Sequence, residues 1–320
     1  MTIRKDGISI IGKEAKLSPP SHYDEHNCCF GLVEGSTDLA MLKNTSAGIC
    51  IHGHNIILAK SYDPSFFHWK VKSVGDPVKD VPISSFKITG FDEENIAVYG
   101  GKNTKISRKK PKEGLRYGFL TAGSTGTEAS NNIVIGSAPS TLKNGPIAMC
   151  MDDFSSAVFS YNDISDYFIG LCTETSDGAN RKNKIHNCCI GNIIDPNISN
   201  AKSLDNHISK WNQGCPPGSA AGISLLGAKN ALVRGNKVSI GLAPPEGGAG
   251  LFLDLEDFFN ATNEDNTITE NVFGENLADI FDDSKGNNYI YDNKCDVAAR
   301  GPLPGTPAPE YCSLAAGVTQ

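Results

Sequence analysis

Acidic residues recur at regular intervals along the second half of the chain. Asp153, Glu174 and Asp195 follow one another at steps of 21 residues. The whole set comprises Asp152, Asp153, Glu174, Asp195, Glu256, Asp257, Asp282 and Asp283, with Gly227 in the intervening repeat. If these positions end equivalent strands, neighbouring carboxylates raise one another's pKa unless a cation or a base lies between them. They could then supply the acid and base of glycoside hydrolysis or ligands for Ca²⁺, whereas the alternative is a row of solvated turn residues.

Basic residues follow closely on the first members of this set, which suggests one pocket with both kinds of group. We predict a catalytic group that consists of Asp152, Asp153, Glu174, Arg181, Lys182 and His186. We predict substrate contacts at Asp177, Trp211, Glu256 and Asp257. Asp153 and Glu174 could bind Ca²⁺, and no other metal or cofactor is predicted. A histidine at the edge of a core with one hydrogen bond is an equal interpretation of His186.

Other chemistries have weaker support in the sequence. His52 and His54 are two residues apart, so they would lie on one face of a strand, but no third metal ligand is evident. Neither a paired Cys-x-x-Cys nor a nucleotide-binding glycine motif is present. The basic segment Lys102 to Lys112 is interpreted as a solvated turn.

The strands and turns that must position these groups follow a repeated sequence pattern. One phrase, an alternating apolar strand, a small or acidic turn, a second short strand and an Asn, occurs at 222–236, 250–271 and 278–293. A parallel coil explains this pattern, because each rung stacks its strands about 4.8 Å from those of the next and cannot bury its apolar face alone. Asn236, Asn271 and Asn293 each end such a phrase, so we expect them to stack as a ladder. A β-sandwich with Asn-rich turns is the alternative.

Several phrases also resemble those of right-handed parallel β-helix proteins in the pectin-lyase-like superfamily. The first is Lys5-Asp6-Gly7-Ile8-Ser9-Ile10-Ile11-Gly12, and similar phrases lie at 48–53, 83–91, 96–101 and 117–119. The segments 131–135, 157–162 and 184–187 resemble second strands of such rungs, and the segment from Asn293 to Cys312 resembles the family's disulfide-pinned tail. The resemblance implies a fold and carries over no catalytic residue.

Composition narrows the classes of partner. The 320 residues include 29 Lys and Arg and 36 Asp and Glu, for a net charge of −7, so no nucleic-acid partner is expected. No run of 18 apolar residues occurs, so no membrane span is expected. Met1 to Ile10 is strand-like and charged, so we predict neither a signal peptide nor the usual N-terminal cap in this chain.

The ten cysteines favour an oxidising compartment. We predict three local bridges, from Cys28 or Cys29 to Cys50, from Cys188 or Cys189 to Cys215, and from Cys295 to Cys312. Cys29 and Cys189 are the preferred partners. Asn44, Asn197 and Asn260 lie in glycosylation motifs, which also indicates a secreted protein. If Met1 is the native start, a cytoplasmic protein with reduced cysteines is the alternative.

The sequence therefore predicts an all-β protein, a single right-handed parallel β-helix over residues 1–294 with a pinned tail at 295–320. Long loops at 172–184 and 195–219 are expected on one face, over the acidic strand ends. The preferred function is a polysaccharide lyase, epimerase or hydrolase. A glycan-binding or partner-binding surface protein is the second hypothesis, and an isomerase or cyclase for a small biosynthetic intermediate is the third. The oligomeric state is left open.

Overall fold

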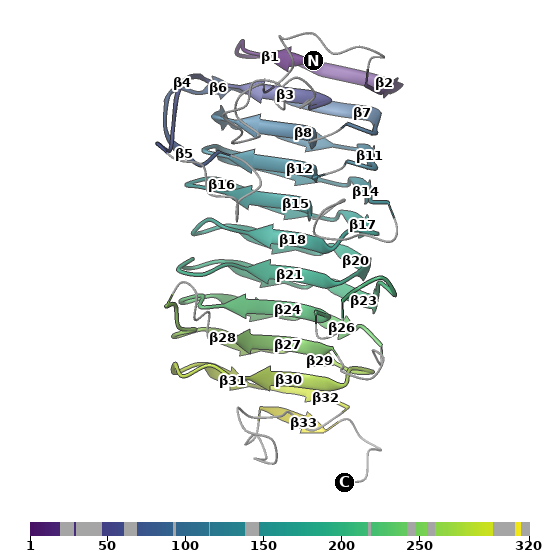
Figure 1. The fold of residues 1–320 in the computed structure, drawn as a ribbon, viewed down its shortest axis with the longest axis vertical. Coiled ribbons are helices and arrows are strands. Elements are labelled where there is room, and N and C mark those ends of the chain that lie inside the picture. The colour runs from purple at the N-terminus through teal and green to yellow at the C-terminus, as the bar shows by residue number, and fades with distance from the viewer. Residues whose placement is uncertain are drawn as a thin grey trace. The chain divides into compact units, whose positions relative to one another are not determined.

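The protein is described by a computed structural model. The structure describes residues 1–19, 29, 47–60, 69–91, 94–114, 116–137, 147–216, 219–241, 248–254, 260–296 and 311–314. The chain divides into two compact units, 1–137 with 142–163, and 138–141 with 164–320. All regular structure in the described residues is β, and in each unit the strands stack as successive rungs (Figure 1).

Unit 1, the first of these, is built on one parallel sheet, three further rows of strands and a hairpin. The parallel sheet contains β1 (Thr2–Ile3), β3 (Ile49–His52), β8 (Glu94–Tyr99), β12 (Tyr117–Ala122) and β15 (Ile147–Asp152). The other strands of the coil in this unit are β2 (Ile10–Leu17), β6 (Val78–Lys79), β7 (Pro82–Thr89), β9 (Gly101–Lys102), β10 (Lys105–Ser107), β11 (Lys110–Lys112), β13 (Thr125–Ser130), β14 (Ile133–Ile135) and β16 (Ser156–Ser160). The hairpin of β4 (His54–Leu58) and β5 (Val71–Asp76) is antiparallel.

Unit 2 repeats a rung of three short strands. Its first row is β18 (Ile169–Thr173), β21 (Ile190–Ile194), β24 (Ala221–Leu226), β27 (Ala249–Asp254) and β30 (Ala278–Asp282). Its second row is β19 (Ala179–Arg181), β22 (Lys202–Leu204), β25 (Leu232–Arg234), β28 (Thr267–Thr269) and β31 (Tyr289–Tyr291). Its third row is β20 (Lys184–Cys188), β23 (His207–Trp211), β26 (Lys237–Ser239), β29 (Val272–Phe273), β32 (Asn293–Cys295) and β33 (Cys312–Leu314), while β17 (Asp163–Ser165) lies where the two units divide.

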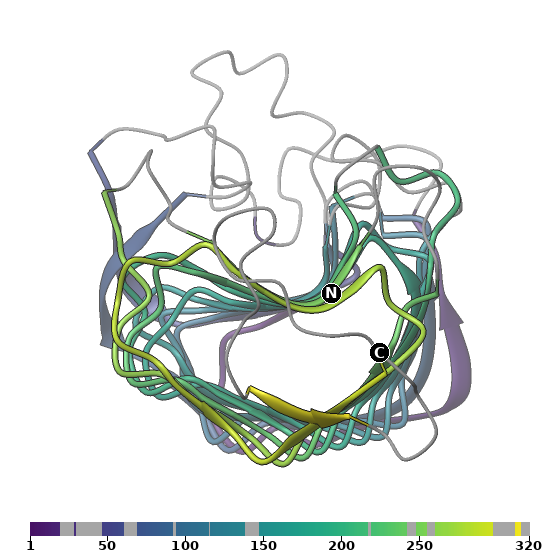
Figure 2. The same cartoon turned by 90° about the horizontal axis from the view of Figure 1, so that it is seen from below.

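The described strand pairing between rungs of each unit is parallel, and its register shifts at two places, between Ile11 and Ala15 on β2 and between Thr125 and Thr127 on β13. Ile223 pairs with Leu251, which pairs with Ile280, and all three side chains are buried. The rungs of each unit superpose when viewed along the stacking direction (Figure 2). The predicted parallel coil is therefore confirmed.

Asparagine side chains form the predicted ladder at one corner of unit 2. In each step a side-chain amide donates to the Oδ1 of the next Asn at 2.9–3.0 Å. The ladder runs through Asn183, Asn206, Asn236, Asn271 and Asn293. A shorter one, Asn132 to Asn162 at 2.8 Å, lies in unit 1. These bonds satisfy buried polar groups that a corner would otherwise leave without partners.

Glycines line a second column in unit 2, inside the first row of strands. A Cβ on Gly170 would lie 2.7 Å from the carbonyl oxygen of Gly191, and one on Gly191 would lie 2.5 Å from that of Gly222. Gly222 repeats the contact with Gly250 at 2.5 Å. The glycine that opens the repeated phrase is therefore required because the next rung's backbone leaves no room for a side chain.

Three disulfides join residues at the predicted places, Cys29 to Cys50, Cys189 to Cys215 and Cys295 to Cys312. At the two places where the sequence left alternatives, the structure pairs Cys29 and Cys189. Cys28 lies outside the described residues. Cys188, Cys150 and Cys172 are buried and lie outside these disulfides.

The stretches predicted as long loops contain strands instead. β18 continues through Cys172 and Thr173, and β19 occupies 179–181 within the expected loop at 172–184. β22 and β23 lie inside the expected loop at 195–219. Their polar composition misled the prediction, because short strands whose outward residues face water carry few apolar residues.

Candidate functional site

Two neighbouring carboxylates and one ammonium group meet in unit 1. Lys70 Nζ lies 2.5 Å from Asp152 Oδ1 and 3.8 Å from Asp153 Oδ1. The carboxylates are nearly buried, with 1% and 4% of their side chains exposed, whereas 19% of the Lys70 side chain is exposed. Lys70 is therefore the member of this group that solvent or a ligand can reach most readily. We call these three residues the lysine-carboxylate group.

The end of β15 and the start of β5 position this group. Asp152 is the last residue of β15, and Asp153 turns the chain with a positive φ of 54°. That turn directs Asp153 Oδ2 to the backbone N–H of Val71, at 2.8 Å, while Asp152 Oδ1 accepts from the backbone N–H of Asp153. The two carboxylates therefore also hold the β4–β5 hairpin against β15. This structural role coexists with any chemical one.

Lys70 was missed by the sequence analysis. It lies 82 residues before Asp152. The hairpin that carries it has no counterpart in the repeated phrase, so neither period nor spacing marks it. A lone lysine at the start of an irregular strand gives no signal in the sequence.

The other predicted catalytic residues lie in unit 2, at separate points of one rung. Glu174 and Asp177 occupy the turn between β18 and β19, and Glu174 Oε1 accepts from the Cys172 thiol at 3.1 Å. Arg181 and Lys182 lie at the far end of β19, and the exposed His186 lies further on, along β20. β19 thus separates the acidic from the basic residues within this rung. Whether Asp153 and Glu174 bind Ca²⁺ together is not tested, because they belong to different units.

The acidic column of unit 2 differs in register from the predicted one. Thr173 pairs with Ile194, so Glu174 and Asp195 directly follow paired residues, as predicted. In the later rungs Leu226 pairs with Asp254, so Leu226 replaces the expected Gly227. Asp282 pairs with Leu253, one position before Asp254. Glu256 and Asp257 lie outside the described residues.

The structure corrects the predicted positions of Trp211 and of the pair His52 and His54. Trp211 is not in a loop but ends β23, where it is half-buried and donates its backbone N–H to Ile240 at 3.0 Å. His52 and His54 do not share a strand, because Gly53 separates β3 from β4. His54 contacts the Arg4 carbonyl at 3.0 Å. Burial lowers the pKa of His52, which favours its neutral form.

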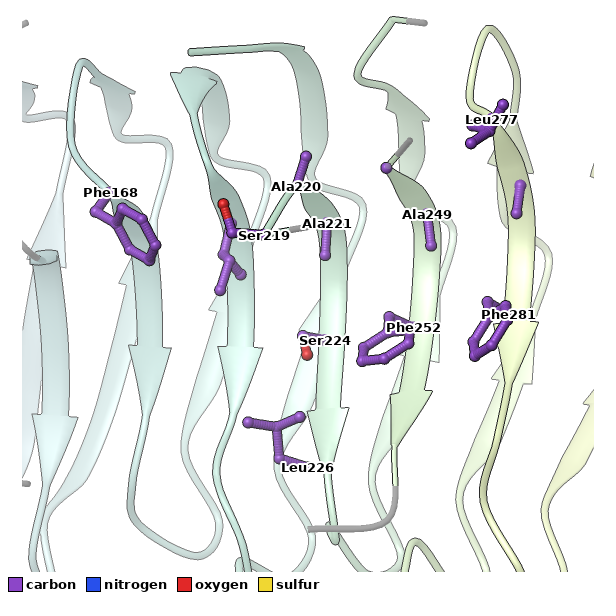
Figure 3. A pocket seen from close by; sticks show the side chains of 13 residues that line it. Phe168, Ser219, Ala220, Ala221, Ser224, Leu226, Ala249, Phe252, Leu277 and Phe281 are labelled. Atoms are coloured by element: carbon purple, nitrogen blue, oxygen red, sulfur yellow. The ribbon is translucent and has the colours of Figure 1, made fainter. Parts of the chain in front are cut away.

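Unit 2 carries an apolar pocket that the sequence did not predict. Its volume is about 480 Å³, and its walls include Phe168, Ile190, Leu226, Phe252, Leu277 and Phe281, with Ser219 and Ser224 as side-chain hydroxyls (Figure 3). Phe252 and Phe281 are paired in register on β27 and β30, and their rings stack with centroids 5.3 Å apart. Ala221, Ala249 and Ala278 form a neighbouring column of small residues. The floor is therefore flat, apolar and partly aromatic, and Trp211 is not part of it.

Comparisons with solved structures identify the architecture. The chain is similar to a variant of the periplasmic alginate epimerase AlgG, with TM-score 0.57 and 14% identity, over 78% of this chain and 59% of that one. The fold is a right-handed parallel β-helix. Another AlgG structure gives TM-score 0.55 at 10% identity and covers 92% of this β-helix and 76% of that chain. DFA-IIIase from Arthrobacter chlorophenolicus A6, without its lid, gives TM-score 0.52 at 12% identity, over 92% and 63%.

Comparisons by sequence add nothing to this β-helix assignment. No protein-family model matches the chain. No curated protein matches it either. The chain spans 59% of the length of the first AlgG structure, and identities of this size show the fold alone. A search of the described residues finds no helix long and apolar enough to cross a membrane.

Proposed function

We propose that this β-helix acts on a carbohydrate and that the lysine-carboxylate group of unit 1 performs the chemistry. The contact of Lys70 with both Asp152 and Asp153 carries the proposal. Structural neighbours add support, because they include an alginate epimerase and DFA-IIIase, both with this fold. A secreted location agrees with the three disulfides.

The charges of the group favour proton transfer next to a sugar carboxylate. Lys70 is the most exposed member, so its ammonium is the group that would meet the substrate and stabilise negative charge as it develops. Asp152 Oδ1 accepts a hydrogen bond from that ammonium, so a proton passed from Lys70 to Asp152 would leave a neutral amine, which could then take a proton from the sugar carbon. Epimerisation and β-elimination of a uronate both begin with removal of such a proton. Hydrolysis is less well supported, because its two carboxylates act on opposite sides of the bond.

The test is a turnover assay on alginate and polygalacturonate, followed by NMR for epimers and by ultraviolet absorbance for unsaturated ends. We expect Lys70→Met to reduce turnover by at least about a hundredfold, the usual loss on removal of an acid-base group. Lys72→Met, two positions further along on β5 and exposed, is the matched control and should retain activity. Thermal melting of both variants checks the fold. Full activity of a folded Lys70→Met protein would exclude this group from catalysis.

The pocket of unit 2 supports a second candidate, a binding protein without catalysis. Stacked Phe252 and Phe281 offer a flat apolar surface of the kind on which the apolar face of a sugar, or another ring, can lie. Phe281→Ala should weaken binding of a glycan or an aryl glycoside, measured by calorimetry, while Tyr291→Ala, an exposed aromatic outside the pocket, should not. Equal affinities of the two variants would argue against a ligand in this pocket.

A further inference from the structure

Three lysines stand in register on adjacent rungs of unit 1. Lys16 on β2 pairs with Lys87 on β7, and Lys87 pairs with Lys110 on β11. All three side chains are exposed. Since paired residues of parallel strands lie about 4.8 Å apart, these three residues form a column of like charge along the sheet. We call it the lysine column.

Neighbouring residues add two positive and two negative charges to the lysine column, so its own three lysines leave the net charge positive. Lys112 lies two positions after Lys110 on the same strand, and Arg108 is exposed at the corner before it. Two carboxylates oppose them: Glu14 lies 3.6 Å from Lys87 Nζ, and Glu113 lies 3.1 Å from Lys112 Nζ. Lys16 and Lys110 have no ion-pair partner among the described residues.

Such a column is unfavourable for folding by itself. Like charges directly opposite on neighbouring strands destabilise a sheet, and these positions tolerate any polar residue. A bound polymer with regularly spaced negative charges would offset the repulsion between the lysines. The lysine column therefore favours binding of an anionic ligand and does not stabilise the fold.

Unit 2 contains a second column, in which two lysines lie on either side of a histidine. Burial and the two lysines lower the pKa of His207, which favours its neutral form, so the lysines carry the charge of this column. Lys184 on β20 pairs with His207 on β23, and His207 pairs with Lys237 on β26. All three side chains are exposed. Arg181 and Arg234 end the preceding strands of the same rungs, and both are exposed. Asp205, at the corner before His207, is the nearest acidic residue in the sequence of that rung.

We propose that each of these columns, within its own unit, is a binding site for a linear acidic polysaccharide. Each column is one residue wide and repeats at the strand spacing, so it matches a single extended chain with one carboxylate per sugar. Several weak contacts along one chain then combine into useful affinity. A duplex nucleic acid is disfavoured by the protein's net charge of −7. The surface is separate from the lysine-carboxylate group and does not depend on the proposed catalysis.

Binding of polygalacturonate oligosaccharides, measured by calorimetry at low salt, tests the proposal. We expect the triple variant Lys16→Ser, Lys87→Ser, Lys110→Ser to lose about tenfold in affinity and to show a weaker salt dependence. The variant Lys184→Ser, Lys237→Ser should also weaken binding. The charge-matched control is Lys102→Ser, Lys105→Ser, Lys202→Ser, which removes three exposed lysines outside both columns and should bind as the wild type does.

Other results would overturn the proposal. An equal loss in the control would show that only total charge matters. Tighter binding of single-stranded DNA, or of vesicles with anionic lipids, through the same lysines would assign the surface to a different partner. Absence of polygalacturonate binding by the wild type would also reject it. The two proposals are tested by different variants, Lys70→Met by turnover and the column variants by binding, so failure of one remains distinguishable from failure of the other.

Discussion

Lys109 Nζ lies 4.2 Å above the centre of the Phe86 ring inside unit 1. Lys109 is 1% exposed, and its ammonium makes no hydrogen bond with the described residues. It follows a corner residue of positive φ, and its backbone N–H donates to Asn132 Oδ1 at 3.0 Å. Lys109 therefore ends the short asparagine ladder of unit 1. The ring contact compensates only part of the lost hydration.

Replacement of Lys109 should stabilise the protein at neutral pH. Burial lowers the pKa of Lys109 from 10.5 to about 7, so between these values the unfolded chain carries a proton that the folded chain lacks. Stability present above pH 10.5 is thus lost as the pH falls towards 7, by at most about 1.4 kcal/mol per pH unit.

We expect Lys109→Met to unfold at higher urea concentration than the wild type at pH 7, with the difference shrinking towards pH 10. Urea titrations across this range measure the effect. Lys105→Met, exposed on β10, is the control and should follow the wild-type curve. Parallel curves for Lys109→Met and the wild type would show that Lys109 is charged in the folded state.

Loss of one central rung of the asparagine ladder should be costly. Asn236 Oδ1 accepts from both the backbone and the side chain of Asn206, and its amide donates to Ser203 O and Asn271 Oδ1. Asn236→Ala leaves several of these buried groups unsatisfied, at about 1–3 kcal/mol each. We expect a loss of roughly 2–4 kcal/mol in chemical unfolding.

The exposed Asn287 gives a matched control for that experiment. Asn287→Ala should change the free energy of unfolding by less than about 0.5 kcal/mol. Similar losses for both variants would mean that the ladder contributes no more than a surface asparagine.

A methyl group at Gly222 should destabilise unit 2 through two contacts of different kinds. Its Cβ would lie 2.2 Å from Val238 Cγ1 and 2.5 Å from Gly250 O. We expect Gly222→Ala to cost about 1–3 kcal/mol. Adding Val238→Ala relieves the contact with the side chain but not the contact with the backbone of Gly250. The double variant should therefore recover only part of the stability that Gly222→Ala loses. Complete rescue would show that the backbone of the next rung yields.

Cys188 should be unreactive in the native protein even though its neighbour Cys189 is in a disulfide. Burial raises the pKa of Cys188 to about 12, so almost no thiolate forms at neutral pH. Iodoacetamide should leave Cys188 unlabelled until denaturant is added, as peptide mass spectrometry can show. Labelling of Cys188 in the native state would contradict its burial, and a Cys188–Cys215 disulfide would contradict the assigned pairing.

The sequence determined the coil and its internal spacing. The phrase that begins with Gly222 repeats because each rung must offer a glycine, inward apolar residues and a corner asparagine to the rung beside it, and this requirement is local in the chain. For the same reason the asparagine ladder was predictable, since its members lie on neighbouring rungs. The cysteine pairs were predicted as local bridges, and the structure decided between Cys28 and Cys29 and between Cys188 and Cys189.

Only the tertiary structure decided which side chains meet where the repeat is interrupted. Lys70 reaches Asp152 from a hairpin outside the rung pattern. Phe252 meets Phe281 because the two residues are paired in register on neighbouring strands, although the rungs differ in length. The lysine column likewise joins Lys16 to Lys87 across 71 positions, as their register requires. Rung lengths differ, so sequence distance does not determine vertical neighbours, whereas backbone hydrogen bonding between strands does.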